Sequence, residues 1–326
     1  MSNVNITLKE AAKILAEKDN ILILCHIRPD GDTLGSGYGL KYALEALGKR
    51  VKVLCGDNIP GRLAFIGEQE QPIENESFDL ICAVDTAETH MLGVYGEKYS
   101  DGIDLKIDHH PTGTPYGKCN HIDGSVAAAG ELIYKVIGFL EELTGQKCLT
   151  PKAASALYAA ITSDTGCFRY SNVTSDTMRV AGALIDAGAD NFDVCFRLFS
   201  LKTRNELNAE KCMHDRLKFH CDGRIVTALF TNADKESYGV TDEDFGGIVS
   251  DMREIEGVEL AVTIRQETVD ASKFRVSMRS GETVNSSELC ALFGGGGHAR
   301  AAGCSVIAST PNEAERAILE RVTVAF

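Results

Sequence analysis

Residues 21–39 constrain the fold of this chain more than any other stretch. An apolar run of strand length ends at His26, and a tight loop with Asp30 and Asp32 follows before a helical pattern begins. A continuous apolar run of this length indicates a strand buried in a parallel sheet. Because open α/β sheets bind their ligands at the carboxyl ends of the strands, His26, Asp30 and Asp32 are candidates for a functional site.

Two later apolar runs end in the same types of side chain. One ends in Asp85, and the other ends in Asp108, which His109 and His110 follow directly. A further acidic turn contains Asp164 and follows a helical pattern. The carboxyl ends of parallel strands lie at one edge of a sheet, so we expect these side chains to converge with those of the first loop.

Helix signals place two further elements of the first half. We expect Ser125 to cap a long helix that runs to about Leu143. Thr150 and Pro151 have the spacing of an N-cap followed by proline in the first turn, and the helix that they open is expected to end near Ile161.

The second half has a different pattern. A hairpin signal lies at residues 222–223, and strands are expected over residues 258–266 and 273–279. One helix is expected over residues 241–254 and a terminal helix over residues 311–322. We therefore predict an α/β domain over residues 1–190 with a mainly parallel sheet flanked by helices. A helical linker over residues 191–215 and a smaller α+β domain with a mixed sheet over residues 216–326 complete the predicted architecture.

The acidic and histidine side chains of the first half have the character of metal ligands. Oxygen and imidazole ligands without thiolate suit manganese, magnesium or cobalt better than structural zinc. The set is too large for one ion, and two ions about 3.5–4 Å apart are the arrangement that serves phosphoryl transfer. A water between two such ions would lose a proton near neutral pH and become a nucleophile.

The chain resembles a known enzyme family over nearly its whole length. Four segments resemble the motifs of the DHH phosphoesterase superfamily: His26-x-x-Pro-Asp30-Gly-Asp32, Asp85, Asp108-His109-His110 and Asp164-Thr-Gly166. The segment Gly-Gly-Gly-Gly-His298-x-Arg-Ala-Ala-Gly resembles the signature of the DHH-associated C-terminal domain. The short two-domain length is similar to that of the bacterial nanoRNase and 3′-phosphoadenosine-5′-phosphate phosphatase type.

This resemblance implies a role for each motif residue. One manganese ion would be held by His26, Asp30 and Asp85, and a second by Asp32, Asp85, His109 and Asp164, with Asp85 bridging the two ions. The catalytic residues would be His110, which would face the scissile phosphate, and Asp108, which would orient a histidine or serve only the structure.

The resemblance also implies that the glycine-rich segment binds the nucleotide end away from the cut. On this basis we assign Arg279, Gly296, His298 and Arg300 to substrate binding, although Arg300 fits a solvated surface position equally well. Glycines let backbone N–H groups approach a ligand closely, and an arginine fork suits phosphate. Arg28, beside the first acidic loop, could contact a phosphate or lie on the surface.

Composition narrows the partners. The formal net charge of −14 argues against long duplex nucleic acid, while bound divalent ions would still allow a short anionic substrate. No apolar run approaches the roughly 18 residues of a membrane span. Eleven cysteines without a Cys-x-x-Cys pair fit free thiols, so we expect a cytoplasmic protein, with a homodimer as an open option.

The predicted function is manganese-dependent hydrolysis of short oligoribonucleotides to mononucleotides, of 3′-phosphoadenosine-5′-phosphate to AMP, or of both, by a hydroxide activated between two metals. Enzymes with a similar metal core leave alternatives: a phosphodiesterase of cyclic or linear dinucleotides, or a pyrophosphatase or exopolyphosphatase. A nucleotide-binding regulator without activity is a further alternative, and the intact ligand set argues against it.

Overall fold

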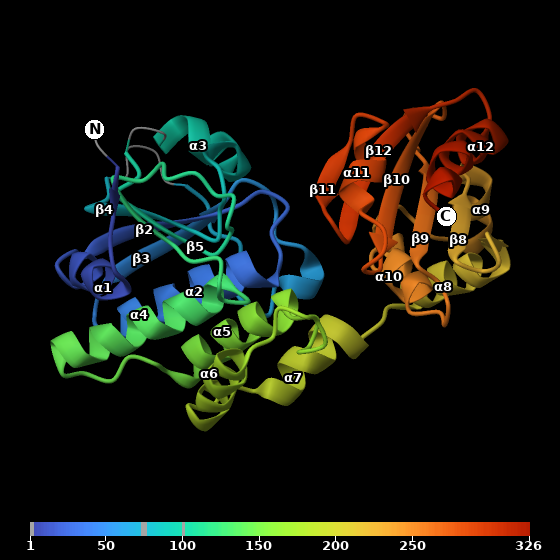
Figure 1. The fold of residues 1–326 in the computed structure, drawn as a ribbon. Coiled ribbons are helices and arrows are strands. Elements are labelled where there is room, and N and C mark those ends of the chain that lie inside the picture. Colours follow the sequence, from blue (N-terminus) through green and yellow to red (C-terminus); the bar gives the residue numbers. More distant parts are fainter. Residues whose placement is uncertain (1–2, 73–76, 100–101) are drawn as a thin grey trace. The chain divides into compact units, whose positions relative to one another are not determined.

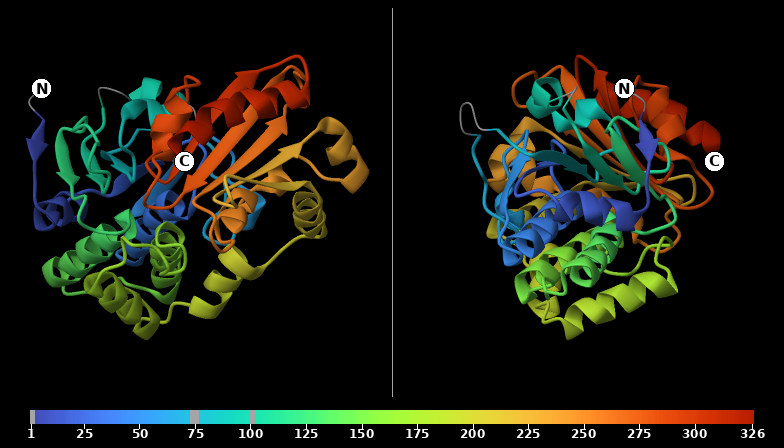
Figure 2. Two further views of the ribbon diagram at one scale, coloured as in Figure 1. Left: turned by 45° about the vertical axis from the view of Figure 1, so that its right-hand side comes forward. Right: turned by 90° about the vertical axis from the view of Figure 1, so that its left-hand side faces the viewer.

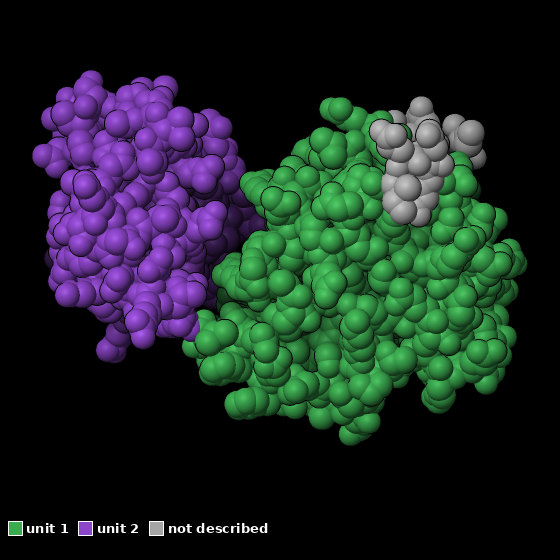
Figure 3. Space-filling model, turned by 180° about the vertical axis from the view of Figure 1, so that it is seen from behind, with its two compact units in different colours: residues 1–201 green, residues 202–326 purple. Residues whose placement is uncertain are grey.

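The chain divides into two compact units, residues 1–201 and 202–326 (Figures 1 and 3). The computed structural model describes residues 3–72, 77–99 and 102–326. In those ranges, no helix has the length and apolar character that crossing a membrane requires. Each unit contains its own sheet, and the predicted α/β architecture is confirmed.

The first unit is built on a parallel sheet. Its strands lie in the order β1-β6-β5-β4-β2-β3, and each neighbouring pair runs parallel. The strands are β1 (Val4–Asn5), β2 (Asn20–Cys25), β3 (Arg50–Cys55), β4 (Leu80–Val84), β5 (Leu105–Asp108) and β6 (Cys119–Ile122). Because β2, β4 and β5 are adjacent, the three strands expected to deliver ligands end next to one another.

Helices cover both faces of this sheet (Figure 1). The larger apolar core lies between the sheet and α1, α2, α4 and α5, whereas α3 and the preceding short turn cover the other face. The helices are α1 (Leu8–Ala16), α2 (Gly31–Ala46), α3 (Val94–Tyr99), α4 (Ala129–Thr144), α5 (Pro151–Asp164), α6 (Ser175–Asp186) and α7 (Asn191–Cys195), and a π-helical turn follows at Phe196–Ser200.

Helices α2 and α5 approach each other unusually closely. Three glycines, Gly31, Gly35 and Gly39, follow one another at intervals of one helical turn along α2. A Cβ atom on Gly35 would lie 2.4 Å from the carbonyl oxygen of Ala156, and one on Gly31 would lie 2.6 Å from the Cβ of Ser163. Without side chains at these positions, the start of α2 can lie against the end of α5, which brings Asp164 to the first acidic loop.

Two helix boundaries differ from the sequence prediction. Ser125 does not cap α4, which begins after Ala128, because the Ser125 hydroxyl donates to Asp123 instead. Helix α5 runs three residues past Ile161, since the N–H of Thr165 still bonds the Ile161 carbonyl, and the chain leaves the helix at Gly166 with a φ of +55°. Asp164 therefore belongs to the last turn of a helix.

The second unit has a mixed sheet in the order β11-β12-β10-β9-β8-β7, in which β8 and β9 are parallel and the other neighbours are antiparallel. The strands are β7 (Leu217–His220), β8 (Ile225–Phe230), β9 (Leu260–Gln266), β10 (Lys273–Ser280), β11 (Gly296–His298) and β12 (Ala301–Ile307). The hairpin signal at residues 222–223 is confirmed by the pairing of β7 with β8.

Helices pack on each face of this second sheet, and α12 lies along the strands (Figure 2). They are α8 (Arg204–Arg216), α9 (Asn232–Tyr238), α10 (Ile248–Arg253), α11 (Ser286–Ala291) and α12 (Pro311–Val322). The single helix expected over residues 241–254 is wrong. Gly247, with a φ of +94°, separates a short turn at Glu243–Phe245 from α10.

Candidate metal centre

Five structural elements deliver the predicted metal ligands to one place in the first unit. His26 follows β2, Asp85 follows β4, and His109 follows β5. Asp30 and Asp32 lie at the start of α2, and Asp164 lies at the end of α5. These six side chains form two groups of three: His26, Asp30 and Asp85, and Asp32, His109 and Asp164. Within each group, every side chain offers one ligand atom, and these atoms lie within 4.8 Å of one another.

The first group contains His26, Asp30 and Asp85. The Nε2 atom of His26 lies 3.7 Å from Oδ1 of Asp30 and 3.5 Å from Oδ2 of Asp85. The other ring nitrogen, Nδ1, lies 2.8 Å from the carbonyl oxygen of Ile27. Since a carbonyl can only accept, Nδ1 donates to Ile27, and Nε2 is the ring atom that faces the two carboxylates. Although burial opposes the shift, Asp30 and Asp85 raise the pKa of His26 to about 11.

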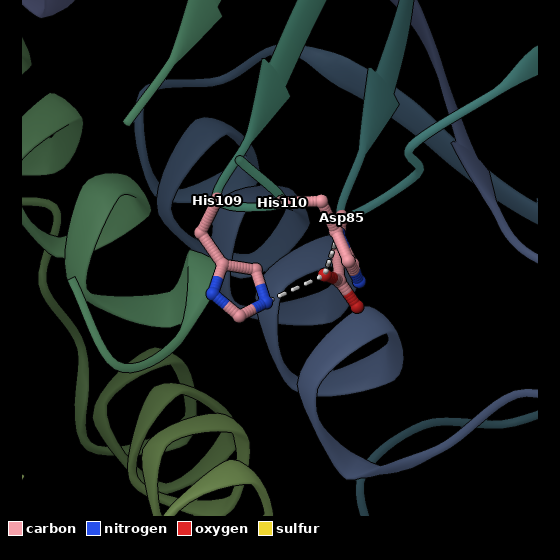
Figure 4. A group of neighbouring side chains, drawn as sticks. All are labelled: Asp85, His109 and His110. Atoms are coloured by element: carbon pink, nitrogen blue, oxygen red, sulfur yellow. Dashed lines mark ion pairs between the residues drawn. The ribbon is translucent and has the colours of Figure 1, made fainter. Parts of the chain in front are cut away.

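The second group contains Asp32, His109 and Asp164. The Nε2 atom of His109 lies 3.6 Å from Oδ2 of Asp32 and 3.4 Å from Oδ2 of Asp164. It also lies 3.4 Å from Oδ1 of Asp85, the interaction drawn in Figure 4. Asp85 thus directs one oxygen toward each group, which is the disposition of a bridging carboxylate.

The backbone of Asp85 supports this position. Its φ is +50°, in the left-handed region that non-glycine residues seldom adopt. Backbone strain of this kind persists where the surrounding structure holds it, and it is frequent at functional sites. Here the Asp85 N–H donates to the carbonyl of Ile107 on β5 over 3.0 Å, so the strained residue is fixed between the two strands that carry ligands.

Asp32 is held with similar precision. Its Oδ1 accepts hydrogen bonds from the Ser36 hydroxyl and the Gly130 N–H, and its Oδ2 accepts one from the Ala129 N–H at 2.7 Å. Ala129 and Gly130 form the first turn of α4, where helix N–H groups have no partner within the helix. The fully buried carboxylate is therefore oriented before any ligand binds.

The carboxylates of the centre lie close together, and their negative charges raise one another's pKa values. Burial and the charge of Asp85 raise the pKa of Asp32 to about 7. Burial and the charge of Asp32 raise the pKa of Asp164 well above its usual range. Although burial opposes the shift, the nearby carboxylate of Asp85 and the charge of Asp32 raise the pKa of His109 to about 10.

Both carboxyl groups and the imidazole thus hold protons more tightly than in water, which is the response of a site that lacks positive charge. Two buried atoms within it, Oδ1 of Asp85 and Nε2 of His109, have no hydrogen-bond partner among the described residues. Divalent cations would supply the missing positive charge and would bind the two atoms that lack a hydrogen-bond partner. Carboxylate and imidazole together are a donor set that such cations accept. The residues therefore fit the metal ions that the sequence implies.

His110 and Asp108 lie beside the two groups. Nδ1 of His110 lies 2.8 Å from Oδ1 of Asp108, and this hydrogen bond raises the pKa of His110. Asp108 thus contacts His110 directly, and the role expected for Asp108 stays a prediction. The rings of His109 and His110 lie 4.7 Å apart and leave β5 in different directions (Figure 4).

Lys106, which the sequence prediction did not single out, contacts Asp108. Its side chain is fully buried, and its Nζ lies 3.1 Å from Oδ2 of Asp108. It also donates to the carbonyl oxygens of Ala87 and Thr114. The signal was present, because a lysine inside an apolar strand run, two residues before Asp108, has to point to the same face of the strand as that aspartate.

The predicted substrate-binding residues lie in the second unit. Arg279 is paired with Ala301 on β12, which is paired with His298 on β11, so the three side chains share one face of the sheet. Gly296 lies on the same edge strand, and a Cβ there would meet nothing within 4 Å. Arg300 lies in the turn between β11 and β12 and pairs with exposed Glu282 at 3.2 Å.

Comparison with known proteins identifies the family. Residues 20–161 match the DHH family, N-terminal domain, and residues 222–324 match the DHHA1 domain. A protein of Thermus thermophilus named bifunctional oligoribonuclease and PAP phosphatase NrnA is 30% identical over 96% of this chain and 92% of its own length. The chain belongs to the DHH family. It is accordingly a metal-dependent phosphoesterase.

Two further proteins are similar to this chain over nearly its whole length. A protein of Bacillus subtilis with the same name is 28% identical, with 97% of each chain covered. The crystal structure of an exopolyphosphatase-related protein from Bacteroides fragilis superposes with a TM-score of 0.87 at 20% identity, covering 97% of this chain and 96% of that one. This last likeness establishes the fold alone.

Proposed function

We propose that this DHH-family protein hydrolyses short oligoribonucleotides to mononucleotides and 3′-phosphoadenosine-5′-phosphate to AMP, with two manganese ions. The observation that carries the proposal is the position of Asp85, whose two oxygens face two separate ligand groups. The names of the Thermus thermophilus and Bacillus subtilis relatives, which align with almost all of this chain, support the choice of substrates.

The ligand assignment follows the two groups. His26, Asp30 and Asp85 would hold one ion, and Asp85 would hold the second together with Asp32, His109 and Asp164. Manganese suits these oxygen and imidazole donors, and magnesium or cobalt would fit the same set. Two bound divalent ions supply charge neutralisation at the phosphate and lower the pKa of a water held beside them.

His110 is the residue assigned to the scissile phosphate. The hydrogen bond from Nδ1 to Asp108 fixes the ring and leaves Nε2 available. A protonated Nε2 could donate to a phosphoryl oxygen or deliver a proton to the departing oxygen, two contributions typical of general acid catalysis. Lys106 keeps Asp108 in place from the opposite side of the carboxylate.

Arg279, Gly296 and His298 are assigned to the far end of the substrate. The guanidinium and the imidazole suit a phosphate, and the open space beside Gly296 would admit a nucleotide close to the backbone. We therefore place catalysis in residues 1–190 and substrate binding in residues 216–326. Arg300 is left out of this assignment because it is paired with Glu282 at the surface.

A hydrolysis panel with manganese tests the proposal. It contains RNAs of about two to five nucleotides, 3′-phosphoadenosine-5′-phosphate, cyclic di-AMP and its linear form, pyrophosphate and polyphosphate. We expect release of mononucleotides and of AMP, loss of activity in EDTA, and recovery when manganese is restored. Preferred hydrolysis of cyclic di-AMP or of pyrophosphate would refute the substrate assignment, and binding of manganese without hydrolysis of any compound would refute an enzymatic role.

A further inference from the structure

Two free thiols meet in the first unit, close to the end of α5. Cys167 belongs to the turn that follows α5, and Cys195 is the last residue of α7. Their Sγ atoms lie 3.8 Å apart, and both side chains are half-buried, whereas most of the other cysteines are buried. A disulfide joins sulfur atoms about 2 Å apart. A small movement would therefore allow this pair to form one.

The turn that carries Cys167 has a strained backbone. Its residues Gly166, Cys167 and Phe168 have φ values of +55°, +59° and +63°, a region that suits glycine but is unusual for the other two. Hydrogen bonds hold the turn in this form. The N–H of Cys167 donates to the carbonyl of Thr162 over 2.8 Å, and the N–H of Phe168 donates to the hydroxyl of Thr165 over 3.0 Å. Strain of this kind persists only while its surroundings impose it, so a new bond to Cys167 would change the turn.

The same turn positions Asp164, one of the proposed ligands of the second metal ion. Only Thr165 and Gly166 separate Asp164 from Cys167, and the carbonyl of Asp164 accepts a hydrogen bond from the side-chain amide of Asn172 over 3.0 Å. A pull on Cys167 is therefore transmitted to the last turn of α5. Because distances from a metal to its ligands hold to within about 0.2 Å, a metal site is sensitive to small displacements of a ligand.

The two thiols differ in their surroundings. Burial and the neighbouring Cys167 raise the pKa of Cys195 to about 11. Cys195 therefore stays protonated at neutral pH. Since the thiolate is the reactive form of cysteine, Cys167 is the residue that we expect an oxidant to attack first.

We propose that Cys167 and Cys195 are a site of reversible oxidation, whose disulfide displaces Asp164 and weakens the binding of the second metal ion. The oxidant is a peroxide, and the reductant is a low-molecular-weight thiol. The effect on the metal rests on the proposed function, because the ligand set that includes Asp164 belongs to that proposal, whereas the disulfide itself does not depend on it.

The oxidation takes two steps with hydrogen peroxide. The sulfur of Cys167 attacks one peroxide oxygen, the O–O bond breaks, and a sulfenic acid and one water form. The sulfur of Cys195 then attacks the sulfenic sulfur, the S–S bond forms and the S–O bond breaks. The thiol proton of Cys195 leaves with the hydroxyl group as a second water. Two electrons thus pass from the two thiols to the peroxide, and exchange with two molecules of a small thiol returns them to the protein.

Peptide mapping tests whether the bond forms. The metal-free protein is treated with hydrogen peroxide and digested without reductant, and we expect mass spectrometry to find the peptide of Cys167 linked to that of Cys195. Dithiothreitol should remove the link, and Cys195→Ser should not form it. Cys221→Ser is the control and should form it, because Cys221 is likewise half-buried and has a φ of +51° but lies in the second unit.

Manganese calorimetry tests the consequence for the metal. The reduced wild type should bind two ions, and oxidation should weaken the second by about 10–100-fold, the range for a disturbed support of a metal ligand. Dithiothreitol should restore the affinity. Cys195→Ser should bind both ions like the reduced wild type before and after peroxide. In the metal-free protein, amide exchange over residues 164–168 should become faster on oxidation of the wild type and stay unchanged in Cys195→Ser.

The outcomes separate this inference from the proposed function. A wild type in which the two peptides are never linked refutes the oxidation site. A linked protein that binds the second ion as tightly as the reduced one refutes the displacement of Asp164. A reduced wild type that binds fewer than two ions refutes the ligand set of the proposed function. In that case the peptide map still tests the disulfide, and unchanged amide exchange over residues 164–168 would refute its effect on the turn.

Discussion

Replacing Lys106 with methionine tests the buried polar network behind the metal centre. Methionine keeps most of the length of the side chain but lacks the charge and the donors. The variant therefore loses the 3.1 Å ion pair with Asp108 and the hydrogen bonds of 2.9 and 2.8 Å to the carbonyl oxygens of Ala87 and Thr114. Asp108 would keep only its contact with His110.

The expected cost follows from burial. The side chains of Lys106 and Asp108 are both 0% exposed, so water cannot replace the missing cation. Removing one partner of a buried ion pair costs about 3–5 kcal/mol, because the other charge stays buried and uncompensated. Lys118→Met is the matched control. Its ion pair with Asp104 lies at the surface, where the side chains are 43% and 28% exposed, and it should cost about 1 kcal/mol or less.

The assay is urea unfolding followed by circular dichroism, together with hydrogen exchange of the β5 amides. Hydrogen exchange reports the first unit by itself, which matters because a chain of two units need not unfold in one step. Asp108→Asn and the double variant complete a thermodynamic cycle. The double variant should be less destabilised than the sum of the single variants by about 1–3 kcal/mol.

Two results would refute this reasoning. One is a loss of less than about 1 kcal/mol in Lys106→Met, the range of an exposed pair. The other is additivity of Lys106→Met and Asp108→Asn within about 0.5 kcal/mol, which is the behaviour of independent sites. Either would mean that Lys106 does not hold Asp108 in the position from which it orients His110.

Three further predictions concern the metal centre and the glycine-rich segment. His110→Ala should retain manganese binding in calorimetry, and its kcat should fall by about 10²–10⁴-fold. His109→Ala should instead lose affinity for the second ion. Wild-type turnover of His110→Ala at saturating manganese would contradict the role given to His110. In EDTA, the raised pKa values of Asp32 (about 7) and His109 (about 10) make the folded chain bind more protons than the unfolded chain. Thermal stability should therefore fall from about pH 6.5 to 8.5, and manganese should reverse this trend by displacing those protons; a rise in EDTA over this range would count against the shifts. Gly295→Ala should destabilise the second unit, because its Cβ would lie 2.3 Å from the carbonyl oxygen of Gly303. Gly296→Ala should be as stable as the wild type but should bind the substrate more weakly. Equal unfolding midpoints for the two variants would contradict this difference.

The local pattern of the sequence was sufficient for the strands that precede the ligands and for the start of α5. The apolar run that ends at His26 is a buried strand, and the proline after Thr150 opens a helix, because both depend on neighbouring residues. The helix boundaries that the sequence did not predict depend on residues that are distant in the chain. The length of α5 beyond Ile161 depends on its packing against the glycines of α2. The break at Gly247 accompanies the packing of Phe245, from the preceding turn, against Phe230 of β8.

The start of α4 shows why such features are invisible in a local pattern. A cap was expected at Ser125, the nearest suitable side chain, but the first N–H groups of α4 donate to Asp32, which lies 97 residues earlier in the chain. Asp30 has a similar double role, since its Oδ1 accepts from the N–H groups of Asp32 and Thr33 at the start of α2. Two proposed metal ligands thus satisfy the ends of two helices. The helix N-termini stabilise the carboxylates in their ionised form and fix their direction, so the fold orients both ligands without the metal.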